Sequence, residues 1–265
     1  MLYVCVPSHN ESATVGLMLW KIRKTFQAFP REYEILVADD GSTDATAEIL
    51  EPYTTALPLT VIRHGERQGY AKSVEALLRL AVERTDRPKR DAAILMSADF
   101  THGPEYLPEM VKRLESGADL VVGEASVTGE PRRGARLVRR YAGMLLRNVR
   151  VPGVRDIVSG YSAFRLAALK AAFRAQETAL LSNEGWAANA ELIGKVARQS
   201  RRVEVVNVVE RHDLRQRPSR IDPWPLAKEL WAVGGRLRIK AERSATAPKG
   251  AGREAADPEL EEATR

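Results

Sequence analysis

The sequence predicts an α/β fold in which a mostly parallel sheet is flanked by helices. Over the first 125 residues, short runs rich in Val, Ile and Leu alternate with helical patterns. This alternation is typical of right-handed βαβ units, whose strands lie parallel. Polar loops follow three of these strand candidates, and parallel sheets bind ligands at the carboxyl ends of their strands. The residues directly after each strand are therefore the first candidates for function.

Five strands are expected in this first part, because each is a short apolar run bounded by turn residues. They are Leu2–Val6, Glu34–Ala38, Leu59–Arg63, Ala92–Met96 and Leu120–Val122. Four helices are expected between them, at Ser12–Phe26, Asp44–Leu50, Ala71–Glu83 and Pro104–Glu115. Residue types that favour helix N-caps precede the first two helices, which supports their assignment.

After residue 125 the regular alternation stops. The expected elements are a basic helix at Arg132–Arg150, a segment at Ser159–Arg165, a helix around Glu184–Arg198 and a strand at Val203–Val209. Apolar residues recur at helical spacing in Trp224–Lys240, which predicts an amphipathic helix that packs on the protein's own core or lies on a membrane. We expect residues 1–243 to form one domain. Residues 244–265 are rich in Ala, Pro, Gly and Glu, which predicts a disordered tail.

The composition is ordinary for a globular enzyme, with 44% hydrophobic and 29% charged residues. The net charge of +6 suits a partner that carries phosphate, but aromatic residues make up only 6% and the sequence has no zinc-finger spacing, which argues against a nucleic-acid partner. Cys5 is the single cysteine, so no intrachain disulfide is expected. The sequence shows neither a signal peptide nor a run of about 20 apolar residues. We expect a cytoplasmic protein, either soluble or peripheral at the inner membrane face.

Three polar loops carry carboxylates directly after strands: Pro7-Ser8-His9-Asn10-Glu11, Asp39-Asp40-Gly41-Ser42-Thr43-Asp44 and Ser97-Ala98-Asp99-Phe100-Thr101-His102. Carboxylates gathered at one end of a sheet repel one another unless they face hydrogen-bond donors or a cation. A nucleotide supplies donors, and a divalent ion on its diphosphate supplies positive charge. A purely structural interpretation is that Asp-Gly-Ser is a turn and Asp44 a helix cap. His9 and His102 are interpreted as helix-start or surface residues rather than metal ligands.

The segments Val4–Glu11 and Val37–Asp44 resemble the start of the family 2 inverting glycosyltransferases, which have the GT-A fold. Ala98–Pro108 is similar to the metal-motif segment of dolichol-phosphate mannose synthases and their polyprenyl-phosphate relatives. Further blocks that match this group are Ser159–Arg165, Gly185-Trp186 with Glu191, and Ser219-Arg220. The resemblance covers about residues 2–221. It implies a Rossmann-like GT-A sheet, with a nucleotide-sugar half over about residues 1–125 and an acceptor half over about residues 126–243.

The resemblance also implies site residues. Those implied around the nucleotide sugar are Pro7, Ser8, Asn10, Glu11, Asp39, Asp40, Gly41, Arg67, Gly69, Ser97, Ala98 and Asp99. Asp99 is the implied ligand of Mg²⁺ or Mn²⁺ on the diphosphate, and Arg215 is implied to contact phosphate during catalysis. Those implied for the acceptor and its phosphate are Arg139, Ser159, Gly160, Arg165, Glu191, Arg217, Ser219 and Arg220. Arginine suits phosphate because its planar guanidinium donates two parallel hydrogen bonds.

The chain departs from the pattern of this group at several positions. The group's Asp-x-Asp appears here as Ser97-Ala98-Asp99, so the first carboxylate is missing. One carboxylate with substrate phosphates and waters is enough for a magnesium site. Ala71 stands in place of a glycine, and Arg139 and Gly143 stand where the group's acceptor helix has Ser and Asn. These changes bear on the acceptor more than on the fold.

The nature of the acceptor decides which catalytic groups are needed. Inverting transfer is one in-line displacement at the anomeric carbon, and a metal ion and arginines neutralise the leaving diphosphate. A lipid phosphate is already an anionic nucleophile, whereas a sugar hydroxyl needs a carboxylate base. Glu184 and Asp156 are the candidates for that base; a helix cap and a surface turn explain them equally well. The basic segment Arg132–Arg150 is either a solvated helix face or a patch for a phosphate or a membrane.

The leading expectation is an enzyme that moves a hexose from GDP-mannose or a UDP-sugar to a polyprenyl or dolichyl phosphate at the cytoplasmic membrane face. One alternative keeps the fold but uses a soluble hydroxyl acceptor, such as a natural product or polysaccharide. Another is a nucleotide-sugar binder without catalysis, which the missing carboxylate at Ser97 suggests. A nucleotidyltransferase ranks last, because the loop Pro7-Ser8-His9-Asn10-Glu11 contains no glycine.

Overall fold

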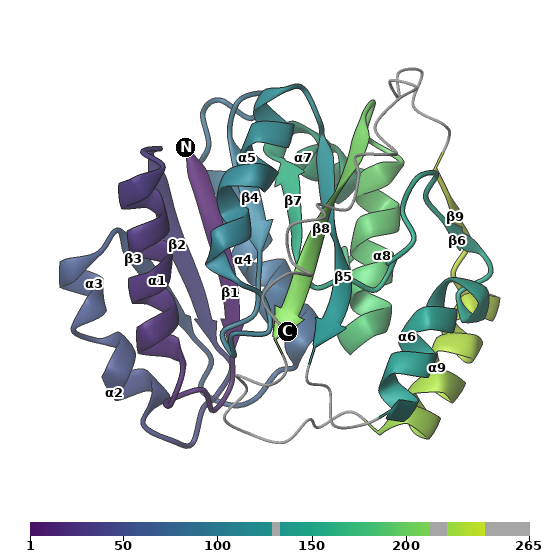
Figure 1. Ribbon diagram of the computed structural model, residues 1–265, viewed down its shortest axis with the longest axis horizontal. Helices are drawn as coiled ribbons and strands as arrows, with labels where there is room; N and C mark the ends of the chain where they lie inside the picture. Colours follow the sequence, from purple (N-terminus) through teal and green to yellow (C-terminus); the bar gives the residue numbers. More distant parts are fainter. Residues whose placement is uncertain (129–132, 212–221, 242–265) are drawn as a thin grey trace, which may run out of the picture.

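A seven-stranded sheet runs through the molecule, with the strand order β3-β2-β1-β4-β7-β5-β8 (Figure 1). The computed structural model describes residues 1–128, 133–211 and 222–241. The strands of this sheet are β1 (Leu2–Ser8), β2 (Tyr33–Asp39), β3 (Leu59–Arg63), β4 (Ala92–Leu95), β5 (Leu120–Thr128), β7 (Ser162–Arg165) and β8 (Val203–Arg211). Every strand expected from the sequence is present, and β5 and β8 extend beyond their expected ends.

The direction of each strand decides which loops meet. Strands β1 to β4 are parallel, and β7 runs antiparallel between β4 and β5. Ser8 at the end of β1 pairs with Asp39 at the end of β2, so both strands finish at the same edge. In β7, by contrast, the last residue, Arg165, pairs with Ala92 at the start of β4. The carboxyl end of β7 therefore lies at the opposite edge from the loops that follow β1, β2 and β4.

Helices cover both faces of the sheet, because its strands are apolar on both sides. In β1, Val4 and Val6 belong to one apolar core and Tyr3 and Cys5 to the other. The first core is covered by α1 (Val15–Ala28), α2 (Thr46–Leu50), α3 (Tyr53–Ala56), the short 3₁₀ turn η1 (Pro104–Tyr106) and α5 (Leu107–Glu115). The second core is covered by α4 (Tyr70–Arg84), α7 (Leu166–Arg174) and α8 (Gly185–Ala197). The result is three layers, with the sheet in the middle (Figure 1).

A smaller layer packs beside α8 and consists of two parallel helix–strand pairs (Figure 1). They are α6 (Arg133–Leu145) with β6 (Val149–Arg150), and α9 (Pro223–Arg236) with β9 (Ile239–Lys240). Two glycines allow the helices to approach closely. A Cβ on Gly134 would lie 2.9 Å from Pro223 Cγ, and a Cβ on Gly234 would lie 2.1 Å from the Leu145 carbonyl oxygen. Larger side chains at these positions would separate α6 from α9.

Both helices of this layer are shorter than the sequence predicts. The basic helix expected at Arg132–Arg150 and the amphipathic helix expected over Trp224–Lys240 each end several residues early. In each case the chain leaves the helix to form a short strand. The Ile239 N–H donates to the Asn148 carbonyl oxygen at 2.9 Å, so backbone groups pair between the two segments instead of within one helix.

The apolar stripe of α9 packs on the protein's own core, which is one of the two arrangements that its pattern allows. Leu230 and Val233 are 0% and 2% exposed and belong to the same core as α8. Within the described ranges, no helix has both the length and the apolar character needed to cross a membrane. The expected tail, residues 244–265, lies outside the described residues.

We expect the neighbouring substitutions Gly234→Ala and Gly235→Ala to have opposite effects on stability. The new methyl group at position 234 would meet the Leu145 carbonyl oxygen, so α9 must shift, which destabilises the fold by about 1–3 kcal/mol. At Gly235 the nearest atom is an Arg147 guanidinium nitrogen at 3.4 Å, and alanine favours a helix by about 1 kcal/mol over glycine. Chemical denaturation measures both variants. Equal free energies of unfolding would contradict the close packing of α6 on α9.

Candidate functional site

A cavity of about 230 Å³, which we call the first cavity, opens at the edge of the sheet where β1, β2 and β4 end. It is lined by Pro7, Ser8, His9, Glu11, Asp40, Arg67, Tyr70, Ser73, Ser97, Ala98 and Asp99. The loops meet here because their strands are neighbours that end at the same edge. Of the twelve residues expected around a nucleotide sugar, eight line this cavity. The other four are Asn10, Asp39, Gly41 and Gly69.

Asp40 carries the buried carboxylate that joins two loops of the first cavity. It accepts hydrogen bonds from the backbone N–H groups of Gln68 and Gly69, at 2.8 and 2.9 Å, and from His64 Nδ1 at 2.9 Å. Burial raises the pKa of Asp40, but these hydrogen bonds outweigh it and hold the pKa below its usual value. The loop that contains Arg67 is thereby fixed to the end of β2.

Asn10 and Gly41 shape the turns between these loops, and both have a left-handed backbone, with φ of 55° and 61°. The Asn10 side chain accepts a hydrogen bond from the Thr43 N–H at 2.8 Å, and the Asn10 N–H donates to Ser42 Oγ at 2.9 Å. A Cβ on Gly41 would lie 2.5 Å from the Arg67 backbone nitrogen, so only glycine fits. These residues hold the loops on which the lining side chains stand.

Asp39 and Asp44, the other two carboxylates of the loop after β2, accept hydrogen bonds from backbone N–H groups. Asp39 accepts a hydrogen bond from the Ser42 N–H at 3.2 Å. Asp44 accepts from the N–H groups of Ser12 and Thr46, at 3.1 and 3.0 Å. Burial raises the pKa of Asp44, but hydrogen bonds from Thr46 and Ser12 lower it to about 2. Asp44 therefore ties the first loop to the start of α2, although the N-cap residue of α2 is Ala45.

The Ser97-Ala98-Asp99 segment enters the first cavity shortly after β4. Asp99 is 5% exposed and accepts a hydrogen bond from the Thr101 N–H at 3.1 Å. Phe100 between them has a φ of 62°, which turns the chain sharply. In the part of the chain that the structure describes, no three His, Cys, Asp or Glu side chains gather into a metal site. A single carboxylate at a cavity still fits a divalent ion whose other ligands are phosphate oxygens and water.

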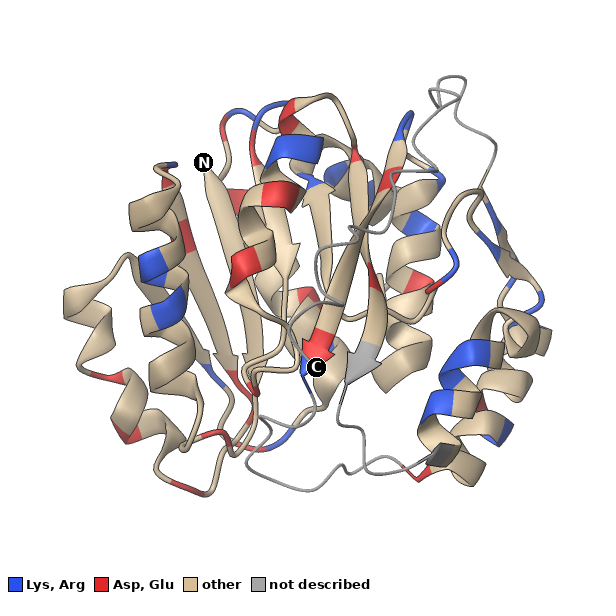
Figure 2. Cartoon of the chain, viewed as in Figure 1, with Lys and Arg blue, Asp and Glu red and all other residues tan. Residues whose placement is uncertain are grey.

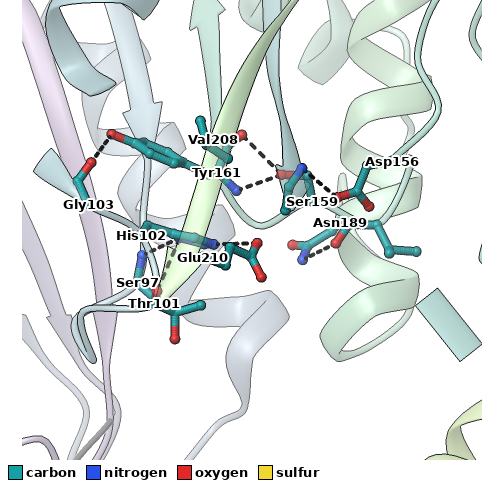
Figure 3. A network of polar contacts seen from close by, with 12 residues as sticks. Ser97, Thr101, His102, Gly103, Asp156, Ser159, Tyr161, Asn189, Val208 and Glu210 are labelled. Carbon is teal, nitrogen blue, oxygen red and sulfur yellow. Dashed lines mark hydrogen bonds and ion pairs between the residues drawn. The ribbon is translucent and has the colours of Figure 1, made fainter. Parts of the chain in front are cut away.

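His102 directly precedes Gly103, the N-cap of η1, as expected for a residue at a helix start, but it is buried, so the expectation of a surface position is wrong. Its side chain is 7% exposed, and its ring stacks on Tyr161 with the ring centroids 5.0 Å apart (Figure 3). Its Nδ1 accepts a hydrogen bond from the Ser97 N–H at 3.0 Å, and its Nε2 lies 3.4 Å from the Glu210 carboxylate. His102 thus packs inside the loop that carries Asp99.

A second cavity, of about 690 Å³, is lined by residues of α6, β5, β8 and the loop before β7. The lining combines four arginines with two carboxylates and three smaller residues: Arg136, Arg139, Arg140, Arg155, Glu124, Asp156, Ala125, Ser126 and Asn207. Within the described ranges, the guanidinium groups of Arg140 and Arg155 have no ion-pair partner. Their positive charge is therefore available to an anion.

Arg139 links the two cavities through buried ion pairs. Its guanidinium is 12% exposed and donates to Asp156 at 2.6 Å and to Glu210 at 2.8 Å. Burial lowers the pKa of Arg139, but the two carboxylates outweigh it and raise the pKa above its usual value. Glu210 is 2% exposed and also faces His102 (Figure 3). Polar contacts therefore run without a break from Ser97 to Asp156.

Two residues expected near the acceptor shape the turn before β7. A Cβ on Gly160 would lie 3.1 Å from the His102 ring and 3.7 Å from the Tyr70 hydroxyl, so this backbone passes close to the first cavity. Ser159 is 1% exposed, and its hydroxyl bonds to the backbone of Tyr161 at 3.2 Å. Ser159 therefore holds the turn that brings Gly160 to the cavity.

Glu191, also expected near the acceptor, is fully buried at 0% exposure. Its carboxylate accepts hydrogen bonds from Ser182, Asn183 and Lys195. Burial raises the pKa of Glu191, but the bonds from Lys195 and the loop outweigh it and hold the pKa below its usual value. With its oxygens engaged in this way, Glu191 fixes the loop before α8 and does not face either cavity.

Both candidate bases are engaged with positively polarised groups. The Glu184 carboxylate accepts the Ala71 N–H at 3.1 Å, in the first turn of α4. Glu184 is also the N-cap residue of α8, but its side chain accepts its hydrogen bond from the start of α4. Asp156 is ion-paired with Arg139. Both carboxylates are therefore already occupied by groups of the protein itself.

Arg165 lies away from both cavities, which does not fit a role in binding the acceptor. Because β7 is antiparallel, Arg165 lies at the opposite edge of the sheet. There it donates to the carbonyl oxygens of Arg90 and Ala118, each at 3.1 Å. The remaining residues expected at phosphate lie outside the described residues, namely Arg215, Arg217, Ser219 and Arg220.

Several lining residues are not among those expected from the sequence. Tyr70 and Ser73 are three residues apart at the start of α4 and face the first cavity together. The Tyr70 hydroxyl donates to Asn189 Oδ1 at 2.8 Å, and burial raises the pKa of Tyr70. The helix start directly after Gly69 is the sequence signal for both. For Arg155 at the second cavity no sequence pattern gives a signal.

Comparison with known proteins identifies relatives of this chain. The model of glycosyl transferase family 2 matches residues 3–173. The chain is 27% identical over 168 residues to a dolichol-phosphate mannosyltransferase of Pyrococcus furiosus, covering 61% of this chain and 45% of that protein. It is 28% identical over 208 residues to an undecaprenyl-phosphate mannosyltransferase of Micrococcus luteus, covering 77% of this chain and 80% of that protein. The chain thus spans less than half the length of the Pyrococcus relative.

Solved structures of glycosyltransferases share the fold. Glucosyl-3-phosphoglycerate synthase from Mycobacterium tuberculosis, in complex with Mn²⁺, UDP and phosphoglyceric acid, has a TM-score of 0.60 at 20% identity, covering 88% of this chain and 76% of that one. TarS of S. aureus in complex with UDP has a TM-score of 0.55 at 19% identity, covering 88% and 64%. These likenesses show the GT-A fold, and the family match spans more than half of the sequence. The chain belongs to glycosyl transferase family 2.

Proposed function

We propose that the chain transfers a hexose, with inversion, from GDP-mannose or a UDP-sugar to a polyprenyl or dolichyl phosphate at the cytoplasmic face of a membrane. The observation that carries the proposal is the first cavity, where three acidic loops and Arg67 meet at the end of a parallel sheet in a family 2 chain. The names of the Pyrococcus and Micrococcus relatives support the class of acceptor.

The first cavity offers the groups that a nucleotide requires. The carboxylates of Glu11 and Asp40 can accept hydrogen bonds from a base N–H and from ribose hydroxyls, and Arg67 can donate to phosphate oxygens. Ser8 Oγ is buried and has no hydrogen-bond partner within the described ranges. A buried hydroxyl without a partner destabilises a fold, and a polar ligand atom would supply the missing bond.

Asp99 is the residue that would hold a Mg²⁺ or Mn²⁺ ion against the diphosphate. The ion, when bound, neutralises the charge that develops on the leaving nucleoside diphosphate. The Ser97 hydroxyl lines the same cavity, and most ligands of the ion would come from phosphate and water. The Mycobacterium tuberculosis synthase, which has a similar fold, contains Mn²⁺ together with UDP.

The second cavity is where we place the phosphate of the acceptor. Arg140 and Arg155 can bind its oxygens, because both guanidinium groups line the cavity. One phosphate oxygen attacks the anomeric carbon, the bond from that carbon to the diphosphate breaks, and the configuration inverts. This nucleophile is already an anion, so the engagement of Glu184 and Asp156 in other contacts is no obstacle.

The outer face of the α6–α9 pair, which we call the α6–α9 surface, suits an anionic membrane. Leu137, Tyr141 and Met144 form one exposed stripe on α6, and Trp224 and Trp231 are 83% and 59% exposed on α9. Lysines and arginines gather on the same two helices (Figure 2), namely Arg136, Arg140, Lys228 and Arg236. Exposed aromatic and basic side chains together bind to the interface of anionic lipids. A polyprenyl phosphate would be presented to the enzyme from such a surface.

A transfer assay tests the proposed function. The full chain is incubated with labelled GDP-mannose or UDP-glucose, polyprenyl phosphate, and Mg²⁺ or Mn²⁺. We expect label to move into the organic phase from one of the two donors, which also identifies the base. Transfer only to a soluble hydroxyl acceptor would show that the acceptor is not a lipid phosphate. Nucleotide binding without transfer to either acceptor would indicate that the chain binds a nucleotide sugar but does not catalyse transfer.

Removal of the Asp99 charge should abolish transfer without unfolding the protein. We expect Asp99→Asn to lower the rate by about 100-fold or more, because the diphosphate loses the ion that stabilises its departure. The matched control is Asp86→Asn, because the Asp86 side chain is 86% exposed and, among the described residues, forms an ion pair only with its neighbour Arg87. Initial rates at saturating donor measure the effect, and thermal unfolding monitors the fold. Equal rates in the two variants would rule out Asp99 as the metal ligand.

Removal of the exposed tryptophans should weaken membrane binding. We expect the double variant Trp224→Ala/Trp231→Ala to bind about tenfold less tightly to vesicles of phosphatidylglycerol and phosphatidylcholine, since aromatic side chains anchor interfacial helices. Trp20→Ala is the control, because Trp20 is 43% exposed on α1, outside the α6–α9 surface. Co-sedimentation with vesicles measures all three proteins. The same loss in the control, or no loss in the double variant, would refute the assignment of this surface.

A further inference from the structure

The neighbours of His102 fix the position of its proton. The Ser97 N–H points at Nδ1 from 3.0 Å, so Nδ1 is an acceptor. The proton of the neutral ring therefore lies on Nε2, which faces the Glu210 carboxylate at 3.4 Å (Figure 3). Each nitrogen of the ring thus meets a group of complementary polarity, one in the loop of the first cavity and one on β8.

Glu210 is held in place from the other side. It is 2% exposed, and it shares the guanidinium of Arg139 with Asp156. A buried carboxylate is tolerated when it is both paired and hydrogen-bonded, and Arg139 supplies both conditions. The position of the carboxylate behind His102 is therefore set by α6, an element distant from the first cavity in the sequence.

The glycosyltransferases that this loop resembles have the motif Asp-x-Asp. Here Ser97 stands in place of the first Asp, so the loop before His102 carries one carboxylate fewer. The position of Asp99 consequently depends on how the backbone of this loop is anchored. Ser97 is anchored at His102 through its N–H, and Ser97 Oγ lies 3.1 Å from the same Nδ1.

We propose that His102 is a positioning residue, which together with Glu210 holds the Ser97-Ala98-Asp99 segment in the geometry in which Asp99 binds the divalent ion. The inference rests on the proposed role of Asp99. His102 and Glu210 are buried and do not line the first cavity. On this proposal they do more than fill space in the core.

Two substitutions of His102 separate its hydrogen bond from its bulk. His102→Asn and His102→Gln both remove the ring that stacks on Tyr161. The Asn amide oxygen takes the place of Nδ1 and still accepts the Ser97 N–H. The Gln amide reaches the place of Nε2 instead and leaves that N–H without its acceptor. A role limited to packing would make the two variants alike.

The affinity of the full chain for Mn²⁺, with UDP or GDP present, is the readout. It is measured by the loss of the free-ion signal in electron paramagnetic resonance, which needs no catalytic turnover. We expect His102→Gln to weaken Mn²⁺ binding about tenfold and His102→Asn by less than about threefold, because residues that support a metal ligand set its affinity. Equal losses in both variants would overturn the proposal.

Glu210→Gln tests the part that the Glu210 carboxylate plays beside His102, since the substitution keeps the shape of the side chain and removes its charge. The matched control is Glu204→Gln on the same strand, where Glu204 pairs with Arg113 and Arg202. We expect Glu210→Gln to raise the Mn²⁺ concentration for half-maximal transfer by about threefold to tenfold, with kcat at saturating Mn²⁺ nearly unchanged. The control should change neither quantity. An unchanged Mn²⁺ requirement in Glu210→Gln would exclude its part in the proposal.

Asp99→Asn distinguishes a failure of this inference from a failure of the proposed function. If Asp99→Asn binds Mn²⁺ as well as the unaltered chain, Asp99 is not the metal ligand, and its metal role and the positioning role of His102 fail together, while the transfer assay still tests the proposed function. If Asp99→Asn loses Mn²⁺ binding while His102→Gln retains it, the metal role of Asp99 stands and the positioning role of His102 is wrong.

Discussion

The site depends on the stabilisation of buried carboxylates at one edge of the sheet. Glu11, Asp39, Asp40 and Asp99 are each only 4–6% exposed. Charges buried so close together are unfavourable unless hydrogen-bond donors face them. The chain supplies these donors largely from the backbone of neighbouring loops, as the N–H groups around Asp40 show. The strands bring the loops to one edge, and hydrogen bonds between the loops then fix the geometry of the cavity.

The reversed strand β7 separates the two edges of the sheet functionally. Its amino end lies at the edge with the cavities, so the turn with Asp156 and Gly160 contributes to the site. Its carboxyl end lies at the opposite edge, where Arg165 supports backbone carbonyl groups. The segment Ser159–Arg165 thus begins at the edge with the cavities and ends at the opposite edge.

The fold could be predicted largely from the sequence, because parallel strands and amphipathic helices leave periodic patterns. Most of the first cavity follows from the same reasoning, since all its lining residues except Arg67, Tyr70 and Ser73 lie in the polar loops expected after strands. The Arg139–Glu210 pair could not be predicted, because its members are 71 residues apart and no periodic pattern connects them. Arg165 could not be placed either, because a motif does not reveal the direction of its strand. The ends of α6 and α9 depend on pairing between β6 and β9, which is a tertiary contact.

The distribution of the two regions along the chain has a consequence for synthesis on the ribosome. All residues that line the first cavity lie between Pro7 and Asp99, whereas the α6–α9 surface requires α9, which ends at Arg236. The ribosome makes a chain from its amino terminus, at about 5–20 residues per second. A growing chain therefore already contains every residue of the first cavity while it still lacks Trp224 and Trp231. Attachment to lipid through the α6–α9 surface, as we propose it, would have to wait until translation has passed α9, and this surface would not draw an unfinished chain to the membrane.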